Sequence, residues 1–257
     1  KNNSNGFIDP SQSLGMNLMD HISTCRFFTL PVDKSLNNLE SKKNDHLLSG
    51  AGSFFIPIGR NRSSENNFVG GYGLWGGIDR FEPPEILKKH KNTKIGFLIG
   101  HGEVLANNKN AVTLSKLTDQ YDIPIPNITM IWRENEKRMV KEMNRMIELI
   151  INSGNGTIRP VHEILNIPFV KQISNNAVAI KSEAPPPGYY IHEVGGAPMG
   201  KSSENSILDK WNRLWECKNV MVVDGACWPT SSWQSPTLTM MAITKRACEN
   251  AINELKG

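Results

Sequence analysis

The sequence predicts a mixed fold of α/β plus α+β type, and three kinds of stretch carry that prediction. Residues 219–225, Asn-Val-Met-Val-Val-Asp-Gly, form an apolar run that is typical of a strand covered on both faces. Residues 134–152 place apolar side chains at helical spacing. Residues 95–99 and 112–114 are short apolar runs that indicate further strands. Helices and strands are therefore expected in the same chain.

Length and charge narrow the class of protein. The chain has 257 residues, of which 39% are hydrophobic, so one large or two modest domains can each bury a core. Twenty-nine basic against 25 acidic residues give a net charge of +4, and the basic residues are scattered apart from residues 88–94. So weak and diffuse a charge predicts no nucleic-acid partner. No 18-residue apolar run is present, so no membrane segment is expected in this chain. The compartment stays open, and a soluble, cytoplasmic protein is favoured.

The four cysteines argue against a metal site. They show neither a Cys-x-x-Cys pair nor a zinc-like spacing with the six histidines. Free and mostly buried thiols are therefore expected at Cys25, Cys217, Cys227 and Cys248.

The helix predicted over residues 134–152 has a methionine-rich face. Met139, Met143, Met146 and Ile150 follow one another at steps of four, three and four, and Gly154 is suited to end the helix. Such a face usually belongs to a core. Residues 185–188, Pro-Pro-Pro-Gly, then predict a stiff connector between two parts of the chain.

A literal Gly-x-Gly-x-x-Gly motif occurs at residues 71–76. No long apolar strand precedes it, and the region about 20 residues further on is rich in lysine where an acidic ribose contact would be needed. The motif is therefore interpreted as a glycine-rich strand or bend, without a dinucleotide.

His192 is the first candidate for chemistry. The residues that follow it, Glu-Val-Gly-Gly-Ala-Pro-Met-Gly, prevent regular structure and allow the backbone to approach a ligand closely. The predicted strand that follows ends at Asp224 and Gly225, and ligands gather at the carboxyl ends of such strands.

A second helix is predicted after residues 235–237, Ser-Pro-Thr. Ser235 is suited to cap the helix and Pro236 to be its first residue. The predicted apolar face, interrupted only by Lys245, comprises Leu238, Met241, Ala242, Cys248, Ile252 and Leu255. A helix start carries free N–H groups and partial positive charge, so it suits an anionic ligand.

The order of these features resembles the C-terminal part of the glucose-methanol-choline (GMC) family of FAD-dependent alcohol oxidoreductases. The family pattern is His-x-x-Gly-Thr-x-x-Met-Gly, then a strand ending in Asp-Gly-Ala or Asp-Ala-Ser, then Asn-Pro-Thr-Leu-Thr before a helix. Residues 192–200, 219–226 and 235–239 match it in order. Further family segments are similar to residues 17–21, 102–105, 110–114 and 119–124. Gly196 replaces the usual threonine, and Ser235 replaces the Asn or His that lies beside the substrate oxygen.

The resemblance implies a domain organisation. Residues 1–24 would end a connection from the FAD domain, residues 25–186 would form a substrate-binding domain with an antiparallel sheet and helices, and residues 187–257 would return a strand and a helix to the FAD-binding domain. The family's N-terminal dinucleotide-binding part has no counterpart in the sequence.

The resemblance also implies roles for single residues. His192 would accept the hydroxyl proton as general base, although an arbitrary histidine is more often structural. Asp224 and Gly225 would contact FAD, or would merely form a turn. Pro236 and Thr237 would lie against the flavin, and starting the helix is compatible with that role. Ser235 would contact the substrate, or would only cap the helix, with Gln234 or a water making the contact.

The expected activity is the oxidation of an alcohol, sugar, sugar acid or polyol by hydride transfer to FAD. Two alternatives are a non-redox, lyase-type use of the same scaffold and a cofactor-free fragment that acts as a binding or assembly module. The partner is expected to be a small molecule, and the electron acceptor, whether oxygen, quinone or a cytochrome, stays open.

Overall fold

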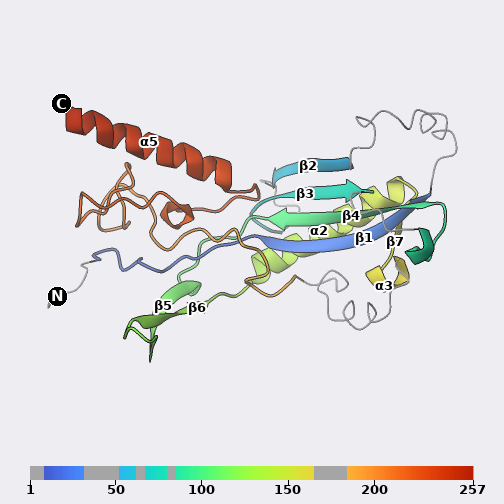
Figure 1. Ribbon diagram of the computed structural model, residues 1–257, viewed down its shortest axis with the longest axis horizontal. Helices are drawn as coiled ribbons and strands as arrows, with labels where there is room; N and C mark the ends of the chain where they lie inside the picture. The colour runs from blue at the N-terminus through green and yellow to red at the C-terminus, as the bar shows by residue number, and fades with distance from the viewer. Residues whose placement is uncertain (1–8, 32–51, 62–66, 80–84, 165–183, 257) are drawn as a thin grey trace. The chain divides into compact units, whose positions relative to one another are not determined.

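The computed structural model describes residues 9–31, 52–61, 67–79, 85–164 and 184–256 (Figure 1). The chain divides into two compact units. The first comprises residues 1–21, 103–133 and 186–257, and the second comprises residues 22–102 and 134–185. Helices and antiparallel strands occur together, so the predicted mixed class is confirmed.

An antiparallel sheet forms the second unit. Its strand order is β2-β3-β4-β1-β7. The strands are β1 (Ile22–Pro31), β2 (Gly52–Asn61), β3 (Gly70–Ile78), β4 (Thr93–Gly102) and β7 (Thr157–Ile158). The predicted strand at residues 95–99 is the middle of β4, which pairs with β1 along its whole length. Two short helices, η3 (Glu85–Leu87) and α3 (Val161–Ile164), also belong to this unit.

The glycine-rich motif at residues 71–76 lies inside β3, as the strand interpretation predicts. β3 pairs with β2 on one side and β4 on the other. Its backbone groups therefore serve the sheet ladder, and they are not free to cradle a phosphate.

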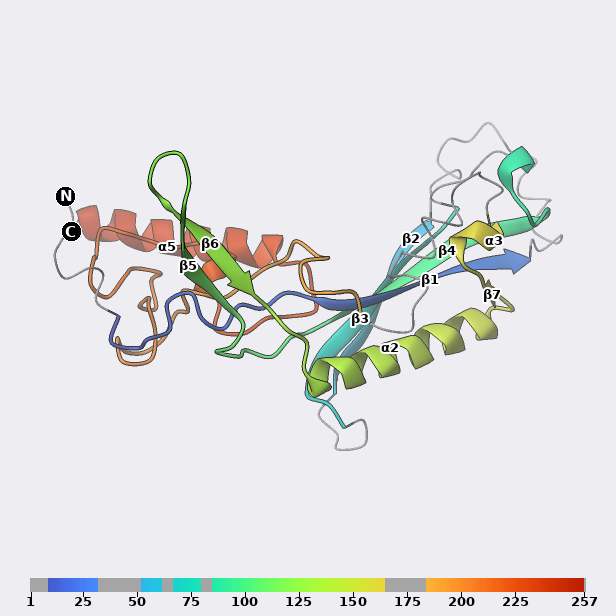
Figure 2. The ribbon, with the colours of Figure 1, turned by 90° about the horizontal axis from the view of Figure 1, so that it is seen from below.

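Helix α2 (Glu134–Ser153) lies along one face of this sheet (Figure 2). Met139, Met143, Ile147 and Ile151 are its fully buried apolar row. Met146 and Ile150, which the sequence places on the core face, are only half-buried. The buried row proceeds in steps of four from Met139 to Ile151, and Met146 and Ile150 lie at its sides. The backbone N–H of Gly154 donates to the carbonyls of Ile150 and Ile151, which ends the helix.

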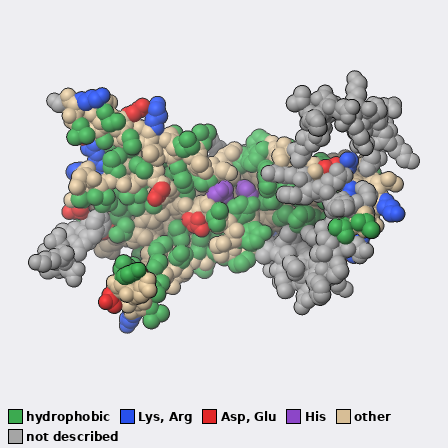
Figure 3. Space-filling view, viewed as in Figure 1, with side chains coloured by type: hydrophobic (Ala, Val, Ile, Leu, Met, Phe, Trp, Pro, Cys, Tyr) green, Lys and Arg blue, Asp and Glu red, His purple; other side chains and the backbone are tan. Residues whose placement is uncertain are grey.

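The first unit carries a two-stranded ribbon of β5 (Ala111–Thr118) and β6 (Pro124–Thr129). It contains the strand predicted at residues 112–114. Figure 3 shows hydrophobic side chains on the ribbon. The exposed ones are Leu114, Leu117, Tyr121, Ile123, Ile125 and Ile128.

The strand predicted at residues 219–225 is not formed, and this prediction is wrong. Met221 makes one isolated bridge with Arg213, and the backbone N–H of Val222 donates to the carbonyl of Asn212 at 2.9 Å. Val220 is 40% exposed. A buried strand needs neighbours along both edges, whereas the described residues supply a loop along one edge only.

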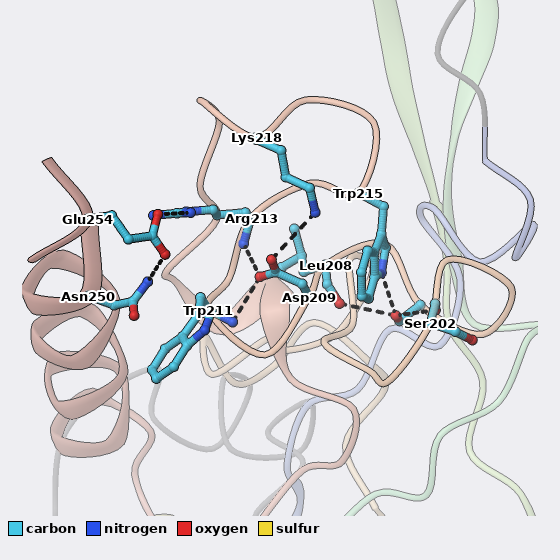
Figure 4. A network of polar contacts seen from close by, with 10 residues as sticks. Ser202, Leu208, Asp209, Trp211, Arg213, Trp215, Lys218, Asn250 and Glu254 are labelled. Carbon is cyan, nitrogen blue, oxygen red and sulfur yellow. Dashed lines mark hydrogen bonds and ion pairs between the residues drawn. The ribbon is translucent and has the colours of Figure 1, made fainter. Parts of the chain in front are cut away.

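Helix α5 (Thr237–Lys256) is joined to the loop of residues 209–218 by polar contacts (Figure 4). Arg213 pairs with Glu254. Arg246 donates to the Lys210 carbonyl at 2.9 Å and to Asn212 Oδ1 at 3.2 Å. The loop itself is held by Asp209, whose carboxylate accepts the backbone N–H groups of residues 211 and 213.

The apolar face predicted for α5 is largely uncovered. Leu238 is 78% exposed and Leu255 is 89% exposed, and Met241, Cys248 and Ile252 are exposed as well. Among the described residues of this helix, only Ala247 is buried. The periodicity correctly identifies an apolar face on this helix. A pattern within one helix does not show which segment packs against that face. No helix in the described ranges is long and apolar enough to span a membrane.

Candidate functional site

The His192 loop is held from both sides within the first unit. Val194 exchanges two backbone hydrogen bonds with Met19, each 2.8 Å long. The N–H of Gly195 donates to the carbonyl of Gly225, also at 2.8 Å. The loop therefore lies between the segment that precedes β1 and the turn that follows residue 224.

The backbone conformation at position 196 favours glycine. Its φ angle is +101°, a region that side chains with a Cβ rarely adopt. The space beside it is open, because an added Cβ would meet nothing nearer than 3.9 Å. The backbone conformation, and not crowding, therefore favours glycine at this position, where the family pattern has threonine.

Asp20 lies at the base of this loop. Its Oδ1 accepts the backbone N–H of His21 at 2.6 Å and that of His192 at 3.3 Å. Burial raises the pKa of Asp20 to about 6, with the charge of Glu193 acting in the same direction and the two N–H groups opposing it. The sequence associates Asp20 with a family-like segment but assigns it no function, because the contact with His192 joins distant parts of the chain.

The imidazole of His192 is half-buried in an aromatic surrounding. The His21 ring meets it edge-on, with ring centroids 5.0 Å apart and an angle of 84° between the planes. The ring centroids of Tyr190 and His192 are 5.9 Å apart. Nδ1 of His192 is buried and has no hydrogen-bond partner in the described part of the chain. Burial lowers the pKa of His192, so the neutral, proton-accepting ring is favoured near neutral pH.

A small hollow lies beside this ring, and in this structure it is too narrow to admit a water molecule. Its lining residues are Asp20, His21, His192, Val194, Trp228, Ser231, Ser232, Gln234 and Pro236. An adjacent open groove of about 260 Å³ shares Trp228, Ser231, Ser232 and Gln234 with it, and extends to Ser235 and Thr239. The structure thus brings His192 and Pro236 together.

Ser235 lies in the neighbouring groove, outside the hollow that contains His192. It is exposed and makes no hydrogen bond with the described residues. Helix α5 begins at Thr237, one residue later than predicted, so Ser235 does not cap it. Its hydroxyl is therefore available to a ligand, and its contact with substrate stays a prediction.

Asp224 begins a short turn, η5 (Gly225–Cys227). Its Oδ1 accepts the N–H of Ala226 at 2.8 Å, which is the turn-forming interaction that the residue type favours. The side chain is exposed, and Oδ2 has no partner among the described residues. A ligand hydroxyl could therefore be accepted without breaking the turn.

Gly225 is required by close packing. A Cβ there would lie 2.8 Å from the carbonyl oxygen of Glu193 and 2.7 Å from the Cε of Met240. Only glycine lets the turn approach the His192 loop and α5 this closely. Pro236 is buried at the edge of the hollow, and Thr237 is the exposed first residue of α5. A helix start therefore lies next to the hollow.

Trp228 and Ser231 are lining residues that sequence reasoning missed. Ser231 Oγ donates to the carbonyl of Val104 at 2.7 Å and accepts the N–H of the same residue at 3.0 Å, so its hydroxyl is engaged. Trp228 is buried, and its Nε1 has no hydrogen-bond partner within the described ranges. Neither residue carries a spacing signal in the sequence.

The chain is similar in sequence to known proteins of one family. A family model described as GMC oxidoreductase matches residues 106–244. The chain is 25% identical over 260 residues to the fructose dehydrogenase large subunit of Gluconobacter japonicus, covering 99% of this chain and 44% of that one. It is also 40% identical over 63 residues to the 2-methyl-1,2-propanediol dehydrogenase of Mycolicibacterium austroafricanum, covering 24% of this chain and 11% of that one.

The fold is similar to that of a formate oxidase from Aspergillus oryzae RIB40, in which FAD modification was studied. The TM-score is 0.58 at 14% sequence identity, and the match covers 96% of this chain and 48% of that one. The chain therefore spans less than half the length of the fructose dehydrogenase subunit and of the formate oxidase.

Proposed function

The chain belongs to the GMC oxidoreductase family, since the family model matches more than half of it, and from this premise we propose that it takes part in FAD-dependent oxidation of a hydroxyl group. The substrate class is an alcohol, sugar, sugar acid or polyol. Three relatives support a hydroxyl donor by name: a fructose dehydrogenase subunit, a propanediol dehydrogenase and a cholesterol oxidase from Acinetobacter baumannii.

The observation that carries the proposal is the state of His192. A buried ring nitrogen without a hydrogen-bond partner loses its hydration with no replacement, which is costly unless a ligand supplies the partner. The ring lines a hollow, and its pKa is lowered by burial. A neutral imidazole with a free nitrogen can accept the proton of the substrate hydroxyl while a hydride leaves the carbon that bears this hydroxyl.

Four residues near the His192 loop would contact a flavin in this proposal. FAD would supply the acceptor for the hydride that leaves the substrate carbon. Pro236 and Thr237 would place the positive end of α5 toward it, where negative charge is stabilised. Asp224 would accept a cofactor hydroxyl through its Oδ2, and Gly225 would keep this turn close to the His192 loop.

Asp20 positions the base in this proposal. Its hydrogen bond to the His192 backbone fixes the start of the loop, and the His21 ring limits how the imidazole can turn. His192 is the proton acceptor, and Ser235 or Gln234 would hold the substrate from the adjacent groove.

The domain assignment is also a proposal. Residues 25–186 would form the substrate-binding domain, flanked by residues 1–24 and 187–257 of the FAD-binding part. One boundary between the two compact units falls between Pro185 and Pro186, within the proline-rich connector. They differ from the predicted ranges at residues 103–133, which group with the first unit.

The test is anaerobic flavin reduction in the FAD-loaded protein, with bleaching followed after addition of D-fructose, D-sorbitol or hexan-1-ol. At least one of these compounds should bleach the flavin in the wild type. The rate should fall by roughly 10² to 10⁴ in His192→Ala, as expected for loss of a general base. His90→Ala is the matched control, because His90 does not line the hollow. Bound flavin that no alcohol or sugar reduces would support the lyase-type alternative.

A further inference from the structure

Trp228 has a buried donor that the protein leaves unused. The side chain is only 7% exposed, and its Nε1 has no hydrogen-bond partner in the described part of the chain. Its backbone is fixed, because Trp228 follows the η5 turn and its N–H donates to the carbonyl of Gly225 at 3.2 Å. A buried indole nitrogen normally has a partner, so the missing acceptor points to a ligand.

The position of Trp228 shows which ligand could supply that acceptor. Trp228 lines both the hollow that contains His192 and the adjacent groove. A molecule that places a hydroxyl at His192 and extends into the groove would therefore pass Trp228.

The polar groups nearby indicate a substrate with more than one hydroxyl. An indole N–H can only donate, so it requires an oxygen acceptor. The hydroxyl of Ser231 is engaged with Val104, whereas the exposed amide of Gln234 has no partner among the described residues. The indole N–H of Trp228 and the side-chain amide of Gln234 therefore have no partners among the described residues, and both residues line the hollow that contains His192.

We propose that Trp228 is a substrate-binding residue whose Nε1–H donates to a second hydroxyl oxygen of a sugar or polyol. The contact selects polyhydroxy substrates over alcohols with a single hydroxyl, because the latter leave the buried donor without an acceptor. This inference rests on the proposed function, since it requires the reacting hydroxyl to lie at His192.

The experiment compares flavin reduction by D-fructose, D-sorbitol and hexan-1-ol in wild type and Trp228→Phe, both loaded with FAD. In the wild type, D-fructose or D-sorbitol should be preferred over hexan-1-ol in kcat/KM. The variant removes the donor and keeps an aromatic ring, so the preference should fall about tenfold, the value of one hydrogen bond.

Trp215→Phe is the matched control. Its Nε1 already donates to Ser206 Oγ at 3.0 Å, and the residue lines neither the hollow nor the groove. The control should therefore keep the wild-type preference.

A measurement on the wild type makes the test independent of how the variant folds. The indole N–H resonance of Trp228 should shift when D-fructose or D-sorbitol is added, and that of Trp215 should not move.

The outcomes separate the two proposals. A wild type that oxidises hexan-1-ol as well as the polyhydroxy compounds, or a Trp228→Phe variant that keeps the wild-type preference, overturns the assignment of Trp228 alone. A wild type whose flavin none of the three compounds reduces overturns the proposed function together with it.

Discussion

Asp20 and His192 are joined by a hydrogen bond across 172 positions of sequence: Oδ1 of Asp20 accepts the backbone N–H of His192 at 3.3 Å. The same oxygen accepts the N–H of His21 at 2.6 Å. One buried carboxylate thus fixes the entry to the loop that carries the proposed base. This contact makes Asp20 a positioning residue with measurable consequences.

Asp20→Ala should slow flavin reduction while Asp20→Asn largely preserves it. Alanine leaves two N–H donors without an acceptor, which costs about 1–3 kcal/mol for each buried group, whereas the asparagine carbonyl can replace the carboxylate oxygen. Stopped-flow bleaching and thermal melting of both variants provide the check. Equal loss of rate in the two variants would mean that the charge of Asp20, and not its acceptor oxygen, supports the site.

Asp20 should also make stability depend on pH. Its pKa is raised by burial from 3.8 to about 6 in the folded protein, so between these values the folded state holds a proton that the unfolded chain has lost. The free energy of unfolding should therefore fall as pH rises from about 4 to about 6. Asp20→Asn cannot ionise, so its melting temperature relative to wild type should be higher at pH 7 than at pH 4. A difference that does not change with pH would contradict the raised pKa.

Flavin reduction by the wild type should lose rate only at acidic pH. Burial lowers the pKa of His192 below its ordinary 6.5, so the neutral, proton-accepting imidazole persists to lower pH than in an exposed histidine. The bleaching rate, measured anaerobically from pH 5 to pH 9, should decline toward acidic pH with an inflection below 6.5. His192→Ala should be slow throughout and lack this inflection, and an unchanged inflection in that variant would exclude His192 as the titrating group.

Ser235→Ala should change rate without changing stability. Ser235 is exposed and makes no hydrogen bond with the described residues, so its removal should alter the free energy of unfolding by less than about 0.5 kcal/mol. Ser235→Asn reaches further into the groove with a donor and an acceptor, and should retain or raise the rate. Melting curves and kcat/KM of both variants test this pair of statements. If neither variant alters kcat/KM, Ser235 does not contact the substrate.

Arg246→Ala should destabilise the first unit by about 1–3 kcal/mol. The guanidinium donates to the Lys210 carbonyl and to Oδ1 of the buried Asn212, and alanine removes both bonds. Arg145→Ala removes an exposed helical ion pair with Glu142 and serves as control, with an expected loss below about 0.5 kcal/mol. Chemical denaturation compares them, and similar losses would show that the Arg246 contacts add no stability.

Local pattern accounts for much of this protein. Helix α2 follows from apolar spacing and a terminal glycine, and β4 and β5 follow from short runs of strand-forming residues. The glycine-rich stretch of β3 predicts a strand or a bend, and it is a strand. The motifs around residues 192, 224 and 236 were sufficient to identify the family that the family model also matches. These signals depend on neighbours within a few positions, which a sequence displays directly.

Other features depended on what lies beside a segment in space. The run at residues 219–225 has the composition of a buried strand, but the described residues give it pairing along one edge only. The apolar row of α5 is correctly periodic and nevertheless exposed at Leu238 and Leu255. Burial is a property of the surroundings, and the composition of a segment states only its tendency.

The sequence alone determined the types and order of the chemical groups: a histidine in a glycine-rich loop, an Asp-Gly turn and a proline at a helix start. Only the tertiary structure decided that Asp20 holds the His192 loop, that Ser235 caps nothing, and that the Trp228 nitrogen lacks a partner in the described chain. The reason is physical. A hydrogen bond depends on a separation of about 3 Å in space, and residues far apart in sequence reach that separation only after the chain has folded.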